Sequence, residues 1–260
     1  MNNIVFFFSG TGNCLKAAKT IAEELGNCEI VSMGNEKPGK ITLPKKYDSI
    51  GFVFPVYFFG LPKRVVEFIE NLDLSNNQNA YYYSLATHGG DAGNAACQIY
   101  ELIDKRHNIK MNFNCDLKMF SNYVNMYNMK KNVDEITKRS NENLVPIVNS
   151  IKNRETNSIN KLTKVFAFIN TSFRKNVSGK DKNYNISDNC TGCGICSKVC
   201  PVNNIELSCN KPQFKHNCEQ CVACIQYCPL RAINYKNSTQ KRRRYTHPEI
   251  DYRELSRYKH

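Results

Sequence analysis

The feature that most constrains this chain is a cysteine motif that occurs twice near its C-terminal end. Nine of the 13 cysteines fall between Cys190 and Cys228, and eight of these nine form the two copies. Each copy reads Cys-x2-Cys-x2-Cys-x3-Cys-Pro, and the second follows at an offset of 28 residues, with Ile205 and Ile233 also matching. So many thiols in so short a stretch predict metal ligation rather than disulfides, which form in oxidising compartments.

The spacing within each copy indicates which metal group is bound. Three cysteines at three-residue intervals can wrap one face of a cubane, while the cysteine before proline points away toward a second cubane. We therefore predict two [4Fe–4S] clusters with crossed ligands, one held by Cys190, Cys193, Cys196 and Cys228 and the other by Cys218, Cys221, Cys224 and Cys200. Zinc is the alternative. It is disfavoured because tetrahedral zinc sites usually pair two Cys-x2-Cys motifs, which leaves a surplus cysteine in each copy.

The N-terminal half alternates between strand and helix patterns. Residues 3–8 are apolar without alternation, which is typical of a strand buried on both faces. We expect further strands at 28–33, 48–54, 80–86 and 113–120, and helices at 14–25, 62–71 and 92–105. This order predicts an α/β fold with a doubly wound parallel five-stranded sheet. Such sheets bind ligands at the carboxyl ends of their strands.

The loop after the first strand has the composition of an anion site. Gly10 and Gly12 remove side chains where backbone approaches a ligand, and a helix beginning near Asn13 directs its free N–H groups to the same place. No Lys follows the glycines, and no Asp or Glu closes the second strand. We therefore expect a terminal monophosphate rather than a nucleoside triphosphate or a dinucleotide.

These residues resemble the FMN phosphate loop of flavodoxins, in the run Ser9, Gly10, Thr11, Gly12, Asn13 and Cys14. Cys14 departs from the family, which usually has Thr or Ser there. Two later loops also resemble flavin-contacting segments of flavodoxin-like proteins. The resemblance implies FMN contacts from Pro55, Val56, Tyr57, Phe58 and Gly60 in one loop, and from Thr87, His88, Gly89 and Gly90 in the next.

The C-terminal part resembles bacterial two-cluster ferredoxins, with Val222 standing where ferredoxins often carry glycine. The whole chain resembles the EFR1-type flavodoxin–ferredoxin fusions of anaerobic bacteria. This resemblance implies a flavodoxin-like FMN domain over 1–125, a basic helical connector over 126–182, a small α+β ferredoxin domain over 183–236 and a basic tail over 237–260.

The cofactors implied by these motifs suggest electron transfer. FMN exchanges one or two electrons, whereas each cluster passes one at a time. We expect an electron-transfer protein that relays low-potential electrons between the clusters and FMN. One alternative is an FMN-dependent reductase of a small substrate, for which His88 and Asp91 offer the acid/base pair. Another is a nucleic-acid-binding module with structural clusters.

The net charge of +13 is concentrated outside the cofactor motifs. Residues 126–182 carry 12 basic and five acidic side chains, and residues 237–260 carry seven and three. We expect an acidic redox partner such as a ferredoxin, and nucleic acid is less favoured because no recognised binding motif accompanies the charge. No apolar run approaches the ~20 residues of a membrane span, and no signal peptide is visible, so we expect a cytoplasmic protein.

Overall fold

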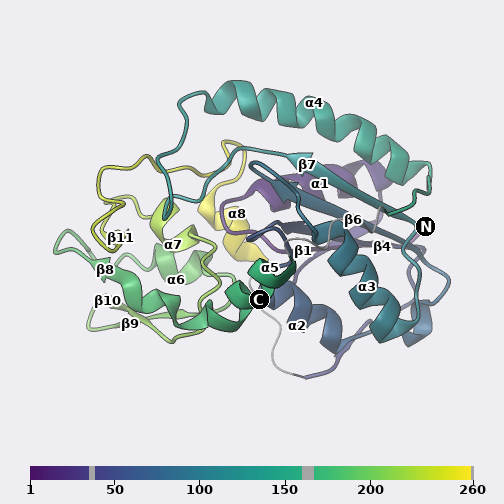
Figure 1. Ribbon diagram of the computed structural model, residues 1–260, viewed down its shortest axis with the longest axis horizontal. Coiled ribbons are helices and arrows are strands. Elements are labelled where there is room, and N and C mark those ends of the chain that lie inside the picture. Colours follow the sequence, from purple (N-terminus) through teal and green to yellow (C-terminus); the bar gives the residue numbers. More distant parts are fainter. Residues whose placement is uncertain (35–38, 160–166, 259–260) are drawn as a thin grey trace.

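The computed structural model describes residues 1–34, 39–159 and 167–258, and it is built around a parallel five-stranded sheet (Figure 1). The strands are β1 (Asn3–Phe7), β2 (Cys28–Ser32), β4 (Ser49–Pro55), β6 (Tyr81–His88) and β7 (Phe113–Lys118). Their order, β2-β1-β4-β6-β7, is the flavodoxin-like order. The predicted strands are confirmed, as are the helices α1 (Asn13–Leu25), α2 (Lys63–Asn71) and α3 (Ala95–His107).

Short elements that the sequence pattern did not predict lie beside this sheet. Strands β3 (Ile41–Thr42) and β5 (Leu72–Asp73) form a separate parallel pair, and a 3-10 turn, η1 (Ser75–Asn77), follows them. With two residues each, these strands are too short to show a periodic pattern.

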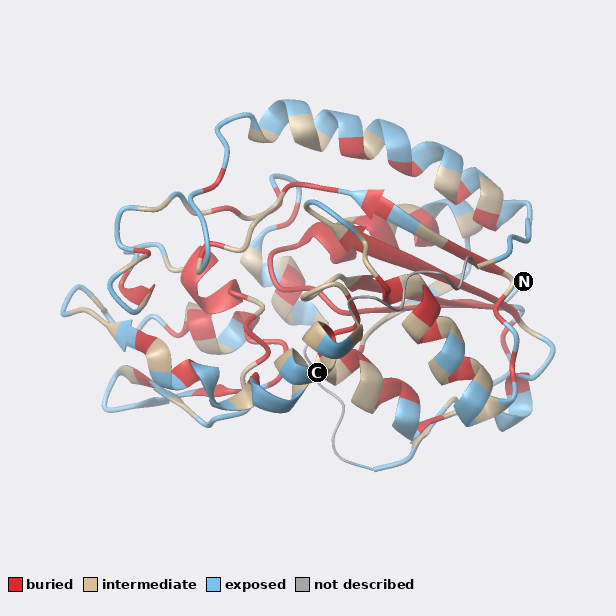
Figure 2. Cartoon of the chain, viewed as in Figure 1, coloured by how far each residue is buried: buried red, intermediate tan, exposed pale blue. Residues whose placement is uncertain are grey.

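The sheet is buried on both faces, as Figure 2 shows. Along β1, Ile4 and Phe6 pack into one core with residues of α2 and α3. Val5 and Phe7 point into the other core, with residues of α1. Because successive strand side chains point to opposite faces, a fully apolar strand is what a doubly wound sheet requires.

Two helices occupy the region between the two cofactor motifs, where the sequence predicted a helical connector. Helix α4 (Val133–Lys152) lies along the outside of the sheet, near α1 and β7 (Figure 1). It buries Leu144, Val148 and Ile151, and its Ser140 hydroxyl donates to the carbonyl of Lys118 at 3.1 Å. Helix α5 (Ala167–Asn176) lies on the opposite side.

The C-terminal part contains two short antiparallel ladders. Strand β8 (Tyr184–Ile186) pairs with β11 (Ile233–Tyr235), and β9 (Ile205–Ser208) pairs with β10 (Lys211–Phe214). Each cysteine motif leads into a short helix, α6 (Ile195–Val199) or α7 (Ala223–Gln226), and a 3-10 turn, η3 (Ser178–Asn183), precedes β8. The sequence repeat is therefore also a repeat of structure.

The two α-helices of this repeat begin in the same way. The residue before α6 is Gly194, with φ 76°, and the residue before α7 is Val222, with φ 59°. Glycine adopts this left-handed conformation readily, whereas a β-branched residue is strained in it.

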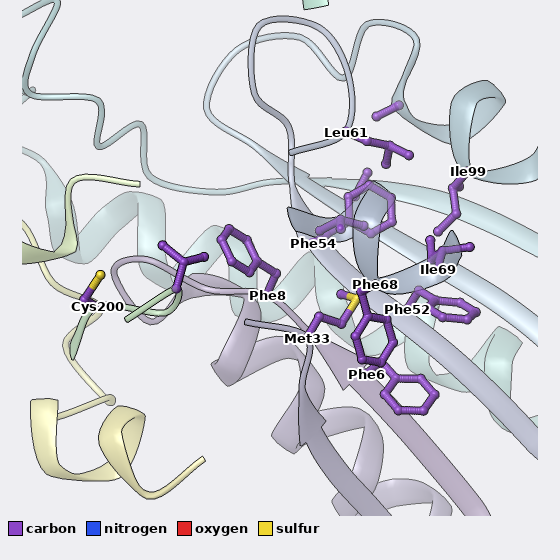
Figure 3. Packing of buried hydrophobic residues seen from close by; sticks show 14 of the residues in the cluster. Phe6, Phe8, Met33, Phe52, Phe54, Leu61, Phe68, Ile69, Ile99 and Cys200 are labelled. Atoms are coloured by element: carbon purple, nitrogen blue, oxygen red, sulfur yellow. The ribbon is translucent and has the colours of Figure 1, made fainter. Parts of the chain in front are cut away.

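The two parts of the chain share a core. In Figure 3, Phe8 and Met33 lie between the aromatic side chains of the sheet and Cys200 of the first motif. All of these residues belong to one cluster of buried side chains. The carbonyl of Pro201 lies only 2.2 Å from where a Cβ on Gly34 would be, so the parts meet in close contact at the end of β2.

The segment after β11 returns to the N-terminal domain, where it ends in α8 (Tyr252–Arg257), drawn in yellow in Figure 1. The charge distribution predicts that the basic run 241–244 lies outside both cofactor regions, but two of its arginines contact those regions. Arg242 donates to the carbonyl of Val124 at 2.7 Å, and Arg244 donates to Asn234 Oδ1 at 2.9 Å. Buried apolar side chains spaced among the charges attach the segment, namely Tyr245, Ile250 and Leu255.

No helix in the described ranges is long and apolar enough to cross a membrane.

Candidate functional site

A cavity of about 430 Å³ opens where β1, β4 and β6 end. Most of the residues predicted to bind FMN line it, namely Ser9, Gly10, Thr11, Asn13, Cys14, Pro55, Val56, Tyr57, Phe58, Thr87, His88, Gly89 and Gly90. The lining does not include Gly12 and Gly60. Three loops that are far apart in the sequence therefore converge on one site, as expected for the carboxyl edge of a parallel sheet.

The first loop forms a polar end of this cavity. Helix α1 begins at Asn13, and the residue before it, Gly12, has no side chain to accept hydrogen bonds from the first turn. The N–H groups of that turn are therefore available to a ligand. Thr11 Oγ1 accepts a hydrogen bond from Asn122 Nδ2, which leaves the Thr11 hydroxyl proton free to donate. Among the described lining residues, none is Lys or Arg.

The two loop glycines also serve packing within the chain. A Cβ on Gly10 would lie 2.4 Å from the carbonyl oxygen of Cys221 in the second cysteine motif. Gly12 has φ 101°, and a Cβ there would lie 2.9 Å from the Cβ atoms of His247 and Ile250. The loop is thus enclosed by the C-terminal part, and this close approach adds a second reason for glycine beside the predicted approach of a ligand.

The second loop gives the cavity an aromatic wall. Tyr57 and Gly60 exchange two backbone hydrogen bonds, of 2.9 and 3.1 Å, and close a tight turn with Phe58 and Phe59 at its centre. Both phenylalanines have positive φ, 47° and 65°. Non-glycine residues in this conformation store strain, which is common at functional sites.

The connector supplies part of this wall. Phe58 stacks on Phe173 of α5 with ring centroids 4.3 Å apart, and it meets Tyr123 edge-on. Phe173 was not predicted as a site residue. Nothing in the local sequence of α5 distinguishes it from an ordinary apolar helix position, so its role depends on long-range packing.

The third loop holds His88 at the cavity with a partner other than the predicted one. The sequence offered His88 and Asp91 as an acid/base pair, and both line the cavity, but they do not pair with each other. The His88 ring donates through Nε2 to Asp116 Oδ2 at 2.9 Å, whereas Asp91 accepts from the backbone N–H of Gly93. The hydrogen bond from His88 holds the pKa of Asp116 below its usual value. Because β6 and β7 are adjacent, side chains at their ends can meet.

The cysteines of the two motifs line two separate small cavities. Cys190, Cys193, Cys196 and Cys228 surround one of them. Cys200, Cys218, Cys221 and Cys224 surround the other. Each set contains three cysteines from one motif and the last cysteine of the other, which is the crossed grouping that the sequence predicted. Within the described ranges, no three His, Cys, Asp or Glu side chains converge closely enough to hold a single metal ion.

Backbone N–H groups point at several of these sulfurs. The N–H of Asn204 donates to Cys200 Sγ, that of Gln220 to Cys218 Sγ and that of Ala232 to Cys228 Sγ, each at 3.2 Å. Hydrogen bonds to ligand sulfurs are one of the means by which a protein sets the reduction potential of an iron–sulfur cluster.

Residues 4–119 match the family model described as the flavodoxin domain. Residues 184–206, which include the first cysteine motif, match the model described as the 4Fe-4S binding domain. The chain thus joins a flavodoxin-like domain to a region with a 4Fe-4S motif. These two domains support electron transfer with FMN and an iron–sulfur cluster. No curated protein matches the chain.

Several solved structures are similar to the flavodoxin domain. A flavoprotein structure from Bacteroides uniformis shares 20% identity over 45% of this chain and 90% of its own, with a TM-score of 0.34. A Lactobacillus acidophilus flavoprotein in complex with FMN shares 12% identity over 44% and 92%, with a TM-score of 0.34. A Streptococcus pneumoniae flavodoxin shares 14% identity over 56% and 99%, with a TM-score of 0.35.

The large cavity of the flavodoxin domain and one of the cysteine cavities are separated by a shared wall. Cys221 and Val222 line both the large cavity and the smaller one surrounded by Cys200, Cys218, Cys221 and Cys224. Val222 is 2% exposed. The other cysteine cavity lies at the surface, where Cys193 is exposed. Of the two cysteine cavities, the one around Cys200, Cys218, Cys221 and Cys224 is therefore the one that adjoins the large cavity.

Proposed function

We propose that this chain relays low-potential electrons between two [4Fe–4S] clusters and one FMN. The observation that carries the proposal is the wall of Cys221 and Val222, which separates the flavin cavity from one cysteine cavity. The cluster of Cys200, Cys218, Cys221 and Cys224 would be the inner one, next to FMN. The cluster of Cys190, Cys193, Cys196 and Cys228 would be the outer one, near the exposed Cys193.

The lining of the large cavity fits FMN. The first turn of α1 and the Thr11 hydroxyl offer neutral donors suited to the phosphate, without a cation. Tyr57 and Phe58 offer aromatic faces for the ring system. When bound, FMN would exchange one or two electrons, so that two-electron and one-electron carriers can be coupled. The protein would position the hydrogen-bond donors for the phosphate and exclude water with the aromatic side chains. Only Cys221 and Val222 would separate the flavin from the inner cluster.

The compartment is part of the proposal. None of the 13 cysteines, all of which lie in the described part of the chain, forms a disulfide, and this suits a reducing compartment in which thiolates stay available as ligands. We therefore propose that the protein works in the cytoplasm, with an acidic redox protein such as a ferredoxin as its partner.

Cofactor content after anaerobic purification tests the proposal. We expect about eight irons, about eight acid-labile sulfides and about one FMN per chain, by analogy with two-cluster ferredoxins. Cys221→Ser is expected to slow the reduction of FMN by a reduced ferredoxin, with FMN still bound. Two zinc ions and no labile sulfide would overturn the assignment.

The second candidate function is an FMN-dependent reductase of a small substrate, and the His88–Asp116 pair favours it. Asp116 fixes the ring of His88 at the cavity through Nε2, and the buried Nδ1 has no hydrogen-bond partner in the described part of the chain. A histidine held by a carboxylate is a common proton donor in catalysis.

His88→Gln distinguishes the two functions. If the protein is a carrier, the variant should pass electrons from reduced ferredoxin to cytochrome c at the wild-type rate. If it is a reductase, turnover of small acceptors such as quinones should fall, and its dependence on pH should change. Asp91→Asn is the matched control, since Asp91 also lines the cavity but accepts from the backbone N–H of Gly93 and does not hold His88.

A further inference from the structure

Gln226 lies on α7 between two cluster ligands, Cys224 and Cys228, and it is 4% exposed. Its side-chain amide hydrogen-bonds with residues outside the cysteine motifs. The oxygen Oε1 accepts from the backbone N–H of Tyr245 at 2.8 Å, and Nε2 donates to the carbonyl of Asn122 at 2.6 Å. One buried amide therefore joins the second cysteine motif to two distant segments of the chain.

Both of these hydrogen bonds continue to the phosphate loop. Asn122 donates through Nδ2 to Thr11 Oγ1. The Tyr245 hydroxyl donates to Asn13 Oδ1 at 2.7 Å, and its ring stacks on Phe120 with centroids 4.4 Å apart. Two hydrogen-bond paths, the Asn122 arm and the Tyr245 arm, thus connect Gln226 to the loop. They end at two different side chains, Thr11 and Asn13.

The arms matter because this loop is lined by no cation in the described part of the chain. An anion there depends on how neutral donors are oriented. By occupying the oxygen of Thr11, the Asn122 arm leaves its hydroxyl proton to donate. By holding Asn13, the first residue of α1, the Tyr245 arm fixes where that helix begins. Buried networks of this kind are rigid when every member is satisfied.

We propose that Gln226 is a positioning residue that couples cluster binding to FMN binding. This inference rests on the proposed function. Ligation of Cys224 and Cys228 fixes α7, and with it the amide that orients both arms. FMN therefore binds most tightly when the second motif is ligated. Because a coupling free energy is reciprocal, bound FMN also stabilises the clusters.

The FMN affinity of Gln226→Met tests the coupling, since methionine keeps the length of the side chain and removes both hydrogen bonds. We expect a roughly 3- to 10-fold rise in Kd per lost arm in cluster-loaded protein, as for ordinary buried hydrogen bonds. Tyr245→Phe keeps the stacked ring, removes one arm and should show the effect of one arm. Gln240→Met is the matched control, because exposed Gln240 donates to the nearby carbonyl of Lys236 and lies outside both paths to the phosphate loop.

Two further measurements separate coupling from a general loss of structure. If Gln226 acts through Thr11, combining Gln226→Met with Thr11→Val should weaken FMN binding by less than the product of the single effects. In air, saturating FMN should slow the bleaching of the cluster absorbance in the wild type, and should do so less in Gln226→Met.

Wild-type FMN affinity in Gln226→Met, or additive effects with equal protection by FMN, would overturn the inference. If Gln226→Met does not assemble clusters, Tyr245→Phe carries the same tests. Absence of FMN or clusters from the wild-type protein would instead contradict the proposed function.

Discussion

The thiol of Cys14 lies 3.1 Å from the hydroxyl of Thr87, so the first turn of α1 is joined to the end of β6 beside the flavin cavity. Burial raises the pKa of Cys14 to about 12, which keeps the thiol neutral at physiological pH. A neutral thiol is a weak hydrogen-bond donor. In flavodoxins this position usually carries a hydroxyl group, whereas here it carries the Cys14 thiol, which contacts Thr87.

Replacing Cys14 with threonine should preserve or tighten FMN binding. A threonine hydroxyl can accept from Thr87 and donate to a phosphate oxygen, and such a charge-assisted bond contributes about 1.5–3 kcal/mol. Fluorescence titration of FMN checks this, with Cys14→Ala as the control that removes the contact with Thr87. Weaker binding by Cys14→Thr than by Cys14→Ala would show that the loop has no room for the hydroxyl.

Cys200→Ser should damage the inner cluster and leave the outer one intact. Cys200 precedes Pro201 in the first motif, but it lines the cavity of Cys218, Cys221 and Cys224. Paramagnetic resonance of the reduced protein should therefore show the same loss in Cys200→Ser as in Cys218→Ser. A spectrum that matches Cys190→Ser instead contradicts the crossed grouping.

Acid should loosen the C-terminal segment through His247. Burial lowers the pKa of His247 from 6.5 to about 4, with Glu249 opposing this shift and Lys16 adding to it. The unfolded chain binds a proton below about pH 6.5, whereas the folded chain resists it. The free energy of unfolding therefore has its full value above about pH 6.5, where His247 is neutral in both states. It falls by up to about 3 kcal/mol as the pH is lowered toward 4.

His247→Asn checks this pH dependence. The asparagine oxygen can replace His247 Nδ1, which accepts from the backbone N–H of Glu249 at 3.2 Å. Urea unfolding at pH 7.5 and at pH 5 should show a smaller loss of stability in the variant than in the wild type. Equal losses would assign the acid sensitivity to carboxylates elsewhere.

The sequence predicted the sheet because its central strands carry clear apolar signals. Residues 3–8 and 48–54 are apolar enough to be recognised singly, and parallel topology then places their following loops at one edge. The grouping of the cysteines was predictable for a similar reason, since short-range spacing restricts which thiols can face one cluster. Whether FMN and two clusters occupy these sites stays a prediction.

Long-range packing is what the sequence could not reveal. The enclosure of the phosphate loop by Cys221 and His247 depends on how the domains meet, which no periodicity encodes. The same holds for Asp116 as the partner of His88 and for Phe173 against Phe58. Charge counts also could not show that Arg242 donates to the carbonyl of Val124, which only the folded chain brings near.

The remaining exposed charges of the C-terminal segment allow a test of the partner. Lys241 and Arg243 are exposed, unlike the half-buried Arg242 and Arg244. Complementary charge between redox proteins raises their rate of encounter more than their affinity. The double variant Lys241→Gln/Arg243→Gln should therefore reduce the rate of electron transfer from an acidic ferredoxin about 2- to 5-fold at low salt, and less at high salt.

Stopped-flow reduction of the flavin at several salt concentrations measures this effect. Lys105→Gln is the control, because Lys105 is an exposed charge on α3, away from the ferredoxin domain in Figure 1. Deleting residues 237–260 is a poorer experiment, since it also removes the contacts of Tyr245 and His247 with the phosphate loop. If nucleic acid is the partner, the double variant should lose DNA or RNA affinity, with a smaller slope against log salt, while electron transfer stays unchanged.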